Sequence, residues 1–136
     1  MSDSQPFGQV VIESNGLITV TLDKSYGQVD GKHYTDHVRG YKDLKRDGKF
    51  DEACNLLKKL IKAAERETAK FERKGCSWAL APAYYWELAI VYRKLQLYAK
   101  ECKILERYIN HSSAVQERIP GFLARLEKAR GLQSKR

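Results

Sequence analysis

The side chains that could support metal chemistry are few and widely spaced. His33 and His37 are four residues apart, a spacing that can place two zinc ligands on one face of a helix. His33, however, precedes the helix that we expect here, and no cysteine or third histidine is positioned to complete the site. We therefore expect neither a metal site nor a cofactor.

Catalytic residues are equally poorly supported. Glu87 and Glu101 lie on two consecutive predicted helices and could approach one another. Arg93 and Lys100 are close to them in sequence, which favours an ion pair over an acid–base dyad. The sequence contains no G-x-S-x-G, P-loop, H-E-x-x-H or G-x-G-x-x-G motif. We therefore expect that the chain is not an enzyme.

The three cysteines favour a reducing compartment. Cys54, Cys76 and Cys102 are odd in number and include no C-x-x-C pair, unlike disulfide frameworks and zinc sites. The first residues lack the basic-then-apolar pattern of a secretory signal. No apolar run approaches the ~20 residues that a membrane helix needs. These features predict a cytoplasmic protein with no membrane partner.

Composition and charge limit the class of molecule. The 136 residues are 43% hydrophobic, which is enough for a domain with a core of its own. Lysine and arginine exceed aspartate and glutamate by 25 to 17, a formal net charge of +8. This charge favours acidic partners.

The sequence predicts strands and loops in residues 1–34 and helices in residues 35–136. Asn15-Gly16 favours a two-residue type I′ turn within a β-hairpin over residues 9–22. That turn would place Val11 opposite Val20 and Ile12 opposite Thr19. A lone hairpin is marginally stable in water, so it must lie on the helices or pair with another chain, as in a homodimer. Asp30-Gly31 is consistent with a second, smaller hairpin.

The helical part predicts five main helices with a core between them. The third, from Ala83 to Gln96, is apolar nearly all round and is expected at the centre of the core. Ser113 and Gln116 match a capping box that would begin a further short helix. The last helix, after Pro120, is expected to turn Phe122-Leu123, Leu126 and Ala129 inward. The other helices are expected at about 35–48, 51–74 and 98–110. The second of these ends before Gly75 and carries an apolar stripe of Ala53-Cys54, Leu57, Leu60-Ile61, Ala64, Thr68 and Phe71.

Two helical hairpins can be superimposed with an offset of 48 residues. The offset aligns Lys45-Arg46 with Arg93-Lys94, Phe50 with Tyr98, Cys54 with Cys102, Leu56-Leu57 with Ile104-Leu105, and Ile61 with Ile109. Such a register predicts a repeated unit that buries its apolar face by stacking on a neighbour. A plain helical bundle is the alternative, and it has nearly the same core.

Residues 35–111 resemble the tetratricopeptide (TPR) family. Tyr85-x2-Leu88-Ala89-x2-Tyr92 matches the family's first-helix pattern, and Gly48-x-Phe50-x2-Ala53 matches its turn and second-helix start. The chain departs from the pattern at Glu101, where the family has Ala, at His37, where it has an aromatic residue, and in its spacing of 48 rather than 34 residues. The resemblance implies a mainly α fold of stacked TPR-like hairpins, here with a C-terminal capping helix and an N-terminal β-hairpin.

The resemblance also implies a binding groove, because in this family the first helix of each hairpin lines a concave surface. One aromatic anchor and five cations would form it, and this combination suits an acidic peptide. We expect Trp86 to face outward there, unless the N-terminal hairpin covers it. The groove positions are Val38, Lys42, Lys45, Arg46, Trp86, Ile90, Arg93 and Lys94.

Three functions therefore remain open. The first is a protein-interaction module, or adaptor, that binds an acidic peptide or protein segment. The second is association with nucleic acid, and the third is a structural or oligomerisation role. The second rests on net charge and on a basic C-terminal region with Arg118, Arg125, Lys128, Arg130, Lys135 and Arg136.

Overall fold

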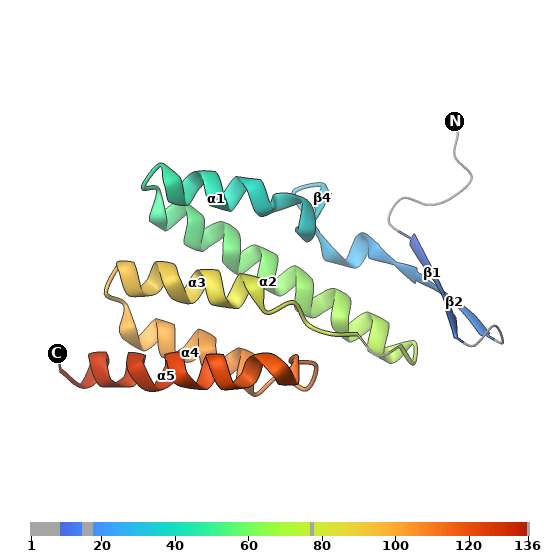
Figure 1. Ribbon diagram of the computed structural model, residues 1–136. Coiled ribbons are helices and arrows are strands. Elements are labelled where there is room, and N and C mark those ends of the chain that lie inside the picture. Colours follow the sequence, from blue (N-terminus) through green and yellow to red (C-terminus); the bar gives the residue numbers. More distant parts are fainter. Residues whose placement is uncertain (1–8, 15–17, 77, 136) are drawn as a thin grey trace.

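The computed structural model describes residues 9–14, 18–76 and 78–135 of the chain. It confirms a mainly α fold with an N-terminal β-hairpin and a C-terminal helix (Figure 1). The helices are α1 (Val38–Arg46), α2 (Phe50–Arg73), α3 (Ala83–Lys94), α4 (Tyr98–Ile109) and α5 (Ile119–Ser134). Short 3-10 turns are η1 (Lys24–Gly27), η2 (Tyr34–His37) and η3 (Gln116–Arg118).

The first hairpin forms where it was predicted, but its register was predicted wrongly. Strands β1 (Gln9–Ser14) and β2 (Ile18–Asp23) pair antiparallel, with Val11 opposite Thr21 and Ile12 opposite Val20. Three residues separate the last pair, Ser14 and Ile18, where a two-residue turn was expected. The additional residue shifts every pair by one position. The predicted Asn15-Gly16 turn itself lies outside the described residues. Figure 1 shows the two strands extending away from the helices.

A second, smaller hairpin connects the first to the helices, as the sequence suggested. Strands β3 (Gln28–Val29) and β4 (Lys32–His33) pair antiparallel around Asp30 and Gly31, whose φ angles are +50° and +84°. Two consecutive left-handed residues are typical of a type I′ turn, which favours Asp-Gly. The segment then packs along α2, since Arg66 donates hydrogen bonds to the carbonyls of Tyr26 and Gln28.

A buried hydrogen bond between a histidine and a glutamate fixes this segment to α2. His33 Nε2 lies 2.5 Å from Glu67 Oε2, and the glutamate is 1% exposed. A Cβ atom at position 27 would lie 2.7 Å from that carboxylate oxygen, so only glycine fits beside the pair. His33 Nδ1 lies 2.8 Å from the Thr35 hydroxyl. Of the two histidines with metal-pair spacing, His33 therefore has a structural role.

The core lies between α2, α3, α4 and α5, and α3 is its centre as predicted. Tyr85, Leu88, Ala89 and Val91 on this helix are completely buried. The predicted apolar stripe of α2 is confirmed, and Gly75 follows its end with a left-handed φ of +83°. The buried members of that stripe are Ala53, Cys54, Leu57, Leu60, Ile61, Ala64, Thr68 and Phe71.

Three local predictions were wrong. Helix α3 ends at Lys94, not at Gln96, because Gln96 adopts a left-handed φ of +59°. Ser113 does not cap a helix: its hydroxyl donates to the carboxylate of Glu72, and η3 has no side-chain cap. Leu123 is 49% exposed instead of inward. The inward stripe of α5 passes through Phe122, Leu126 and Ala129, and the next residue after Phe122 points about 100° away.

Candidate functional site

The eight predicted groove residues lie on α1 and α3, and these helices are in contact. The rings of Tyr41 and Tyr84 meet edge to face, with centroids 6.1 Å apart. Lys45 on α1 forms an ion pair with Glu87 on α3. Val38, Trp86 and Ile90 are half-buried. The structure therefore brings the two predicted sets together on neighbouring helices.

Most of the predicted cations, however, are already neutralised. Besides Lys45, Arg46 lies 3.1 Å from Asp43 on its own helix. Arg93 lies 2.8 Å from Glu101, so this carboxylate is in an ion pair, the arrangement that the sequence favoured over an acid–base dyad. Lys94 lies over the Phe50 ring, 5.7 Å from its centroid. Lys42 is exposed and has no ion pair within the described part of the chain.

Trp86 is covered by α5, an outcome that the sequence did not predict. Its ring meets Phe122 at a centroid distance of 5.1 Å and an interplanar angle of 64°. The guanidinium of Arg125 lies over the same indole, 5.1 Å from the ring centroid. The indole therefore contacts α5 and is only half exposed to solvent. Helix α5 contributes to the site as much as α1 does.

A buried carboxylate holds α3, α4 and α5 in this arrangement. Glu101 on α4 is completely buried and accepts hydrogen bonds from Arg93 on α3 and Arg125 on α5, each at 3.1 Å. Burial and the neighbouring Arg93 lower the pKa of Arg125 below its usual value. Because Arg125 also lies over Trp86, this ionic cluster positions one side of the site.

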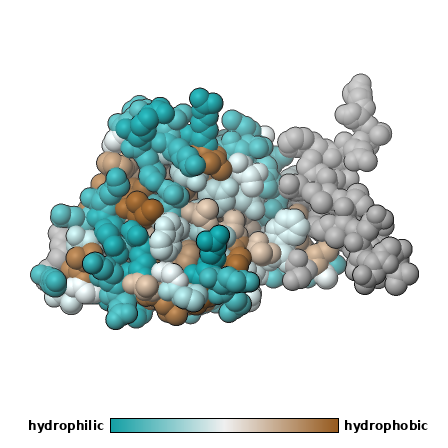
Figure 2. Space-filling model, viewed as in Figure 1, coloured by the Kyte–Doolittle hydropathy of each residue, from teal (hydrophilic) through white to brown (hydrophobic). Residues whose placement is uncertain are grey.

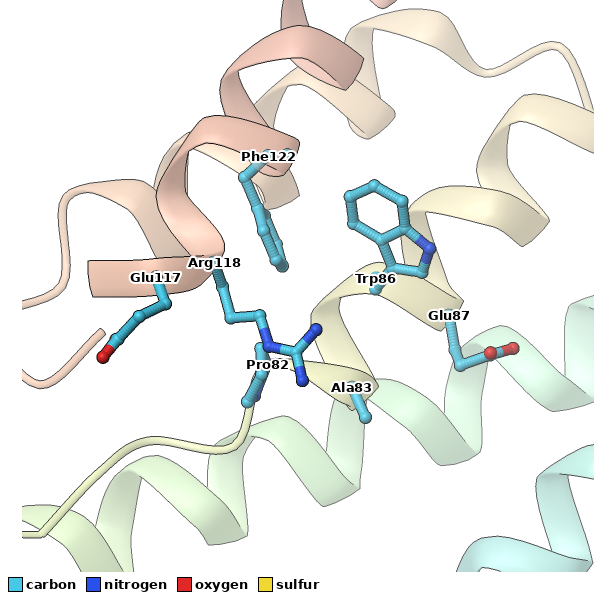
Figure 3. A pocket seen from close by; sticks show the side chains of 8 residues that line it. Pro82, Ala83, Trp86, Glu87, Glu117, Arg118 and Phe122 are labelled. Carbon is cyan, nitrogen blue, oxygen red and sulfur yellow. The ribbon is translucent and has the colours of Figure 1, made fainter. Parts of the chain in front are cut away.

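A pocket of about 380 Å³ opens between the start of α3 and the start of α5. Figure 3 shows the rings of Trp86 and Phe122 close together, with Arg118 reaching towards Pro82 and Ala83. Glu117 points away from the two aromatic rings in the same view. The remaining lining residues are Glu87 and Gly121.

The pocket combines an aromatic surface with an uncompensated positive charge. Of its two glutamates, Glu87 is paired with Lys45, and Glu117 is exposed and directed outward. Arg118 is exposed and forms no ion pair with any residue that the structure describes. A carboxylate entering here would meet a guanidinium beside two aromatic rings. The face of the molecule shown in Figure 2 is mainly hydrophilic, with small separate apolar patches.

Of the eight residues that line this pocket, only Trp86 was among the predicted site residues; the other seven, including Arg118 and Phe122, were not. Phe122 was predicted as a core residue of a capping helix, and it is 2% exposed. A terminal helix that covers the last hairpin necessarily borders the same groove. The residues at the start of this helix could therefore have been predicted as site residues. Among the described residues, no group of three His, Cys, Asp or Glu side chains could hold a metal ion.

Comparisons do not connect this geometry to a known protein. No protein-family model, curated protein or solved structure matches the chain. None of the described helices is sufficiently long and apolar to span a lipid bilayer.

Proposed function

We propose that this chain is a non-enzymatic protein-interaction module that binds an acidic segment of a partner protein. The observation that carries the proposal is the pocket between α3 and α5, where the Trp86–Phe122 surface lies beside the uncompensated guanidinium of Arg118. Tryptophan and arginine are the residue types that most often dominate binding energy at interfaces. Arginine is also the side chain best suited to a carboxylate.

The size of the pocket limits how much of the partner segment can enter it. A volume of about 380 Å³ lies at the lower end of the range for ligand sites, so it accommodates one or two side chains. An apolar side chain would pack against the rings, and an adjacent Asp or Glu would pair with Arg118. Lys42 on α1 offers a further cation to an acidic segment that continues along α3 and α1.

The proposal includes a TPR-like relationship between α1–α2 and α3–α4. In that family the first helix of each hairpin lines the groove. The contacts of α1 with α3, through Tyr41 and Tyr84, support this relationship. So do the contacts of α3 with α5, through Trp86 and Phe122, because they place three alternate helices next to one another.

Selection from a random 12-residue peptide display library tests this function. On the wild-type protein, enriched peptides are expected to carry Asp or Glu next to Leu, Phe or Trp. Arg118→Glu reverses the charge in the pocket and should weaken binding of those peptides at least tenfold. Lys128→Glu is the matched control, because Lys128 is also exposed on α5 but does not line the pocket. Equal binding to all three proteins, or enrichment of basic peptides, would exclude the proposed function.

A further inference from the structure

Four lysines on the outer sides of α2 and α4 form a separate basic surface. Lys58 and Lys62 belong to α2, and Lys100 and Lys103 belong to α4. All four are exposed, and none of them forms an ion pair or side-chain hydrogen bond with the residues that the structure describes. We call these four residues the α2–α4 lysine surface.

An ion pair joins α4 to α2 at one point along the two helices. Arg107 on α4 binds Glu65 on α2 with two hydrogen bonds, of 2.8 and 2.5 Å. Both helices run in the same direction (Figure 1). Lys58 precedes Glu65 by seven residues, and Lys100 precedes Arg107 by seven. Seven residues are about two helical turns, so each lysine faces the same side as the ion-paired residue that follows it, about 10 Å away.

A buried thiol places Lys58 and Lys100 near one another independently. Burial raises the pKa of Cys54, while Lys58 and Lys100 act on it in the opposite direction and Asp51 acts in the same direction as burial. Two ammonium groups from different helices therefore act electrostatically on one sulfur atom. Lys62 is one turn after Lys58 and Lys103 is about one turn after Lys100, so these side chains extend the surface along both helices.

Few acidic groups among the described residues lie near this surface. Glu65 is paired with Arg107, and Glu106 is paired with Arg130 at 2.7 Å. Asp51 and Glu52 are exposed in the first turn of α2, so two carboxylates remain against four lysines. The basic C-terminal region has fewer unpaired cations than its sequence suggested, because Arg125 and Arg130 both form ion pairs.

We propose that the α2–α4 lysine surface binds the phosphate backbone of a nucleic acid without reading its base sequence. Lysine ammonium groups displace the counterions of a polyanion, and this produces affinity that depends on salt but not on sequence. On α2 the exposed neighbours of these lysines are Asn55 and Lys59, which are not apolar, and just before α4 the side chain of Leu97 is 38% exposed three residues before Lys100. A lipid surface would require a broader apolar face to insert into the bilayer. This surface is distinct from the pocket between α3 and α5.

Fluorescence anisotropy with a labelled 20-nucleotide single-stranded RNA of mixed sequence tests the proposal. Binding to the wild-type chain should weaken about 50-fold between 50 and 200 mM KCl, as expected for about four phosphate contacts. The test variant replaces Lys58, Lys62, Lys100 and Lys103 with Gln. The control variant replaces four other exposed lysines with Gln, at Lys32, Lys42, Lys128 and Lys135. Each set lowers the formal net charge from +8 to +4, since eight minus four is four.

The two variants distinguish a local surface from net charge. The test variant is expected to bind at least tenfold more weakly than the control at 50 mM KCl, and its salt dependence should be largely lost. Equal loss in both variants would overturn the proposal in favour of general charge attraction. Binding to phosphatidylcholine–phosphatidylserine vesicles in the absence of RNA binding would overturn it in favour of a membrane surface. Because all substituted side chains are exposed, thermal unfolding of both variants should match the wild type.

Discussion

At the scale of single residues, Glu101 is a completely buried carboxylate that joins Arg93 and Arg125. In the TPR-like arrangement that we propose, it stands where the family pattern has Ala. Burying a charge is costly unless it is paired and hydrogen-bonded. Both oxygens of Glu101 accept from a guanidinium, so the cost is compensated and three helices are tied to one side chain.

Glu101→Gln keeps the shape of the side chain but removes its charge. Arg93 and Arg125 would then lie mostly buried without a counter-charge, at 26% and 17% side-chain exposure. We expect the free energy of unfolding to decrease by about 2–4 kcal/mol. Urea unfolding followed by circular dichroism measures this change.

Glu106→Gln is the control for this substitution on the same helix. Its partner, Arg130, is 60% exposed, and such surface ion pairs contribute less than about 1 kcal/mol. If Glu101→Gln lowers the free energy of unfolding by as little as the control does, the buried cluster does not stabilise the helical arrangement.

At the scale of elements, α5 is attached mainly through Phe122 and Leu126. Phe122 lies between two aromatic rings of the core, with Tyr108 at 4.6 Å and Trp86 at 5.1 Å between centroids. Leu126 is 3% exposed one turn later. The same contacts that hold α5 also form one wall of the proposed binding pocket.

Phe122→Ala should lower the free energy of unfolding by about 2–4 kcal/mol, because it removes a buried ring from the core. Leu123→Ala, one residue later, should change it by less than about 0.5 kcal/mol, since Leu123 is 49% exposed. Chemical denaturation of the two variants under identical conditions gives both values. Similar losses for the two would mean that α5 packs through a different face.

The helices and the buried stripe of α2 could be predicted from the sequence because their signals are local. Apolar spacing identified the members of the α2 stripe, and Gly75 identified the end of α2. The end of α3 could not be predicted, because a glutamine, Gln96, adopts the left-handed conformation that usually requires glycine. The register of the first hairpin depended on one residue in its turn.

The electrostatics of the candidate site could be predicted only in part. Arg93 and Glu101 are eight residues apart on consecutive helices, so their pairing was foreseeable. Lys45 and Glu87 are 42 residues apart, and their pairing depends on how α1 packs against α3. Arg118 lines the same pocket as Trp86 only because α5 packs against α3, and no pattern within one helix contains that information.

At the scale of the whole molecule, buried tyrosines determine the behaviour at high pH. Burial raises the pKa of Tyr84 to about 12, and it also raises the pKa values of Tyr34 and Tyr85 above the ordinary value of 10. Below pH 10 these side chains are neutral in both the folded and the unfolded chain, so the stability gained by burying the tyrosines is fully present. Above pH 10 the unfolded chain ionises first, and this contribution is lost as the pH rises through the folded pKa values.

The chain should therefore unfold cooperatively as the pH is raised from 10 towards 12. Tyrosinate absorbance at 295 nm and helical circular dichroism, recorded on one sample, are expected to change together. A full rise in tyrosinate absorbance while the helical signal stays constant would contradict this expectation, because the buried tyrosines would then ionise within the folded structure.

At low pH, by contrast, stability is lost because a carboxylate becomes protonated. Burial acts to raise the pKa of Glu65, but hydrogen bonds from Arg107 and Tyr85 outweigh it and hold the pKa below the ordinary value of 4.5. The stability from this carboxylate is present above pH 4.5 and is lost as the pH falls below it. Between pH 4.5 and pH 10, we expect the pocket between α3 and α5 and the α2–α4 lysine surface both to keep their arrangement.

The most direct test of binding at the pocket uses the two tryptophans of the chain as internal probes. Trp86 lines the pocket, whereas Trp78 packs against Phe71, with ring centroids 4.4 Å apart. In a ¹H–¹⁵N correlation spectrum, titration with an acidic peptide enriched by display should shift the indole signal of Trp86 and leave that of Trp78 unchanged. Saturable binding of that peptide without any change at Trp86 would contradict the proposed site.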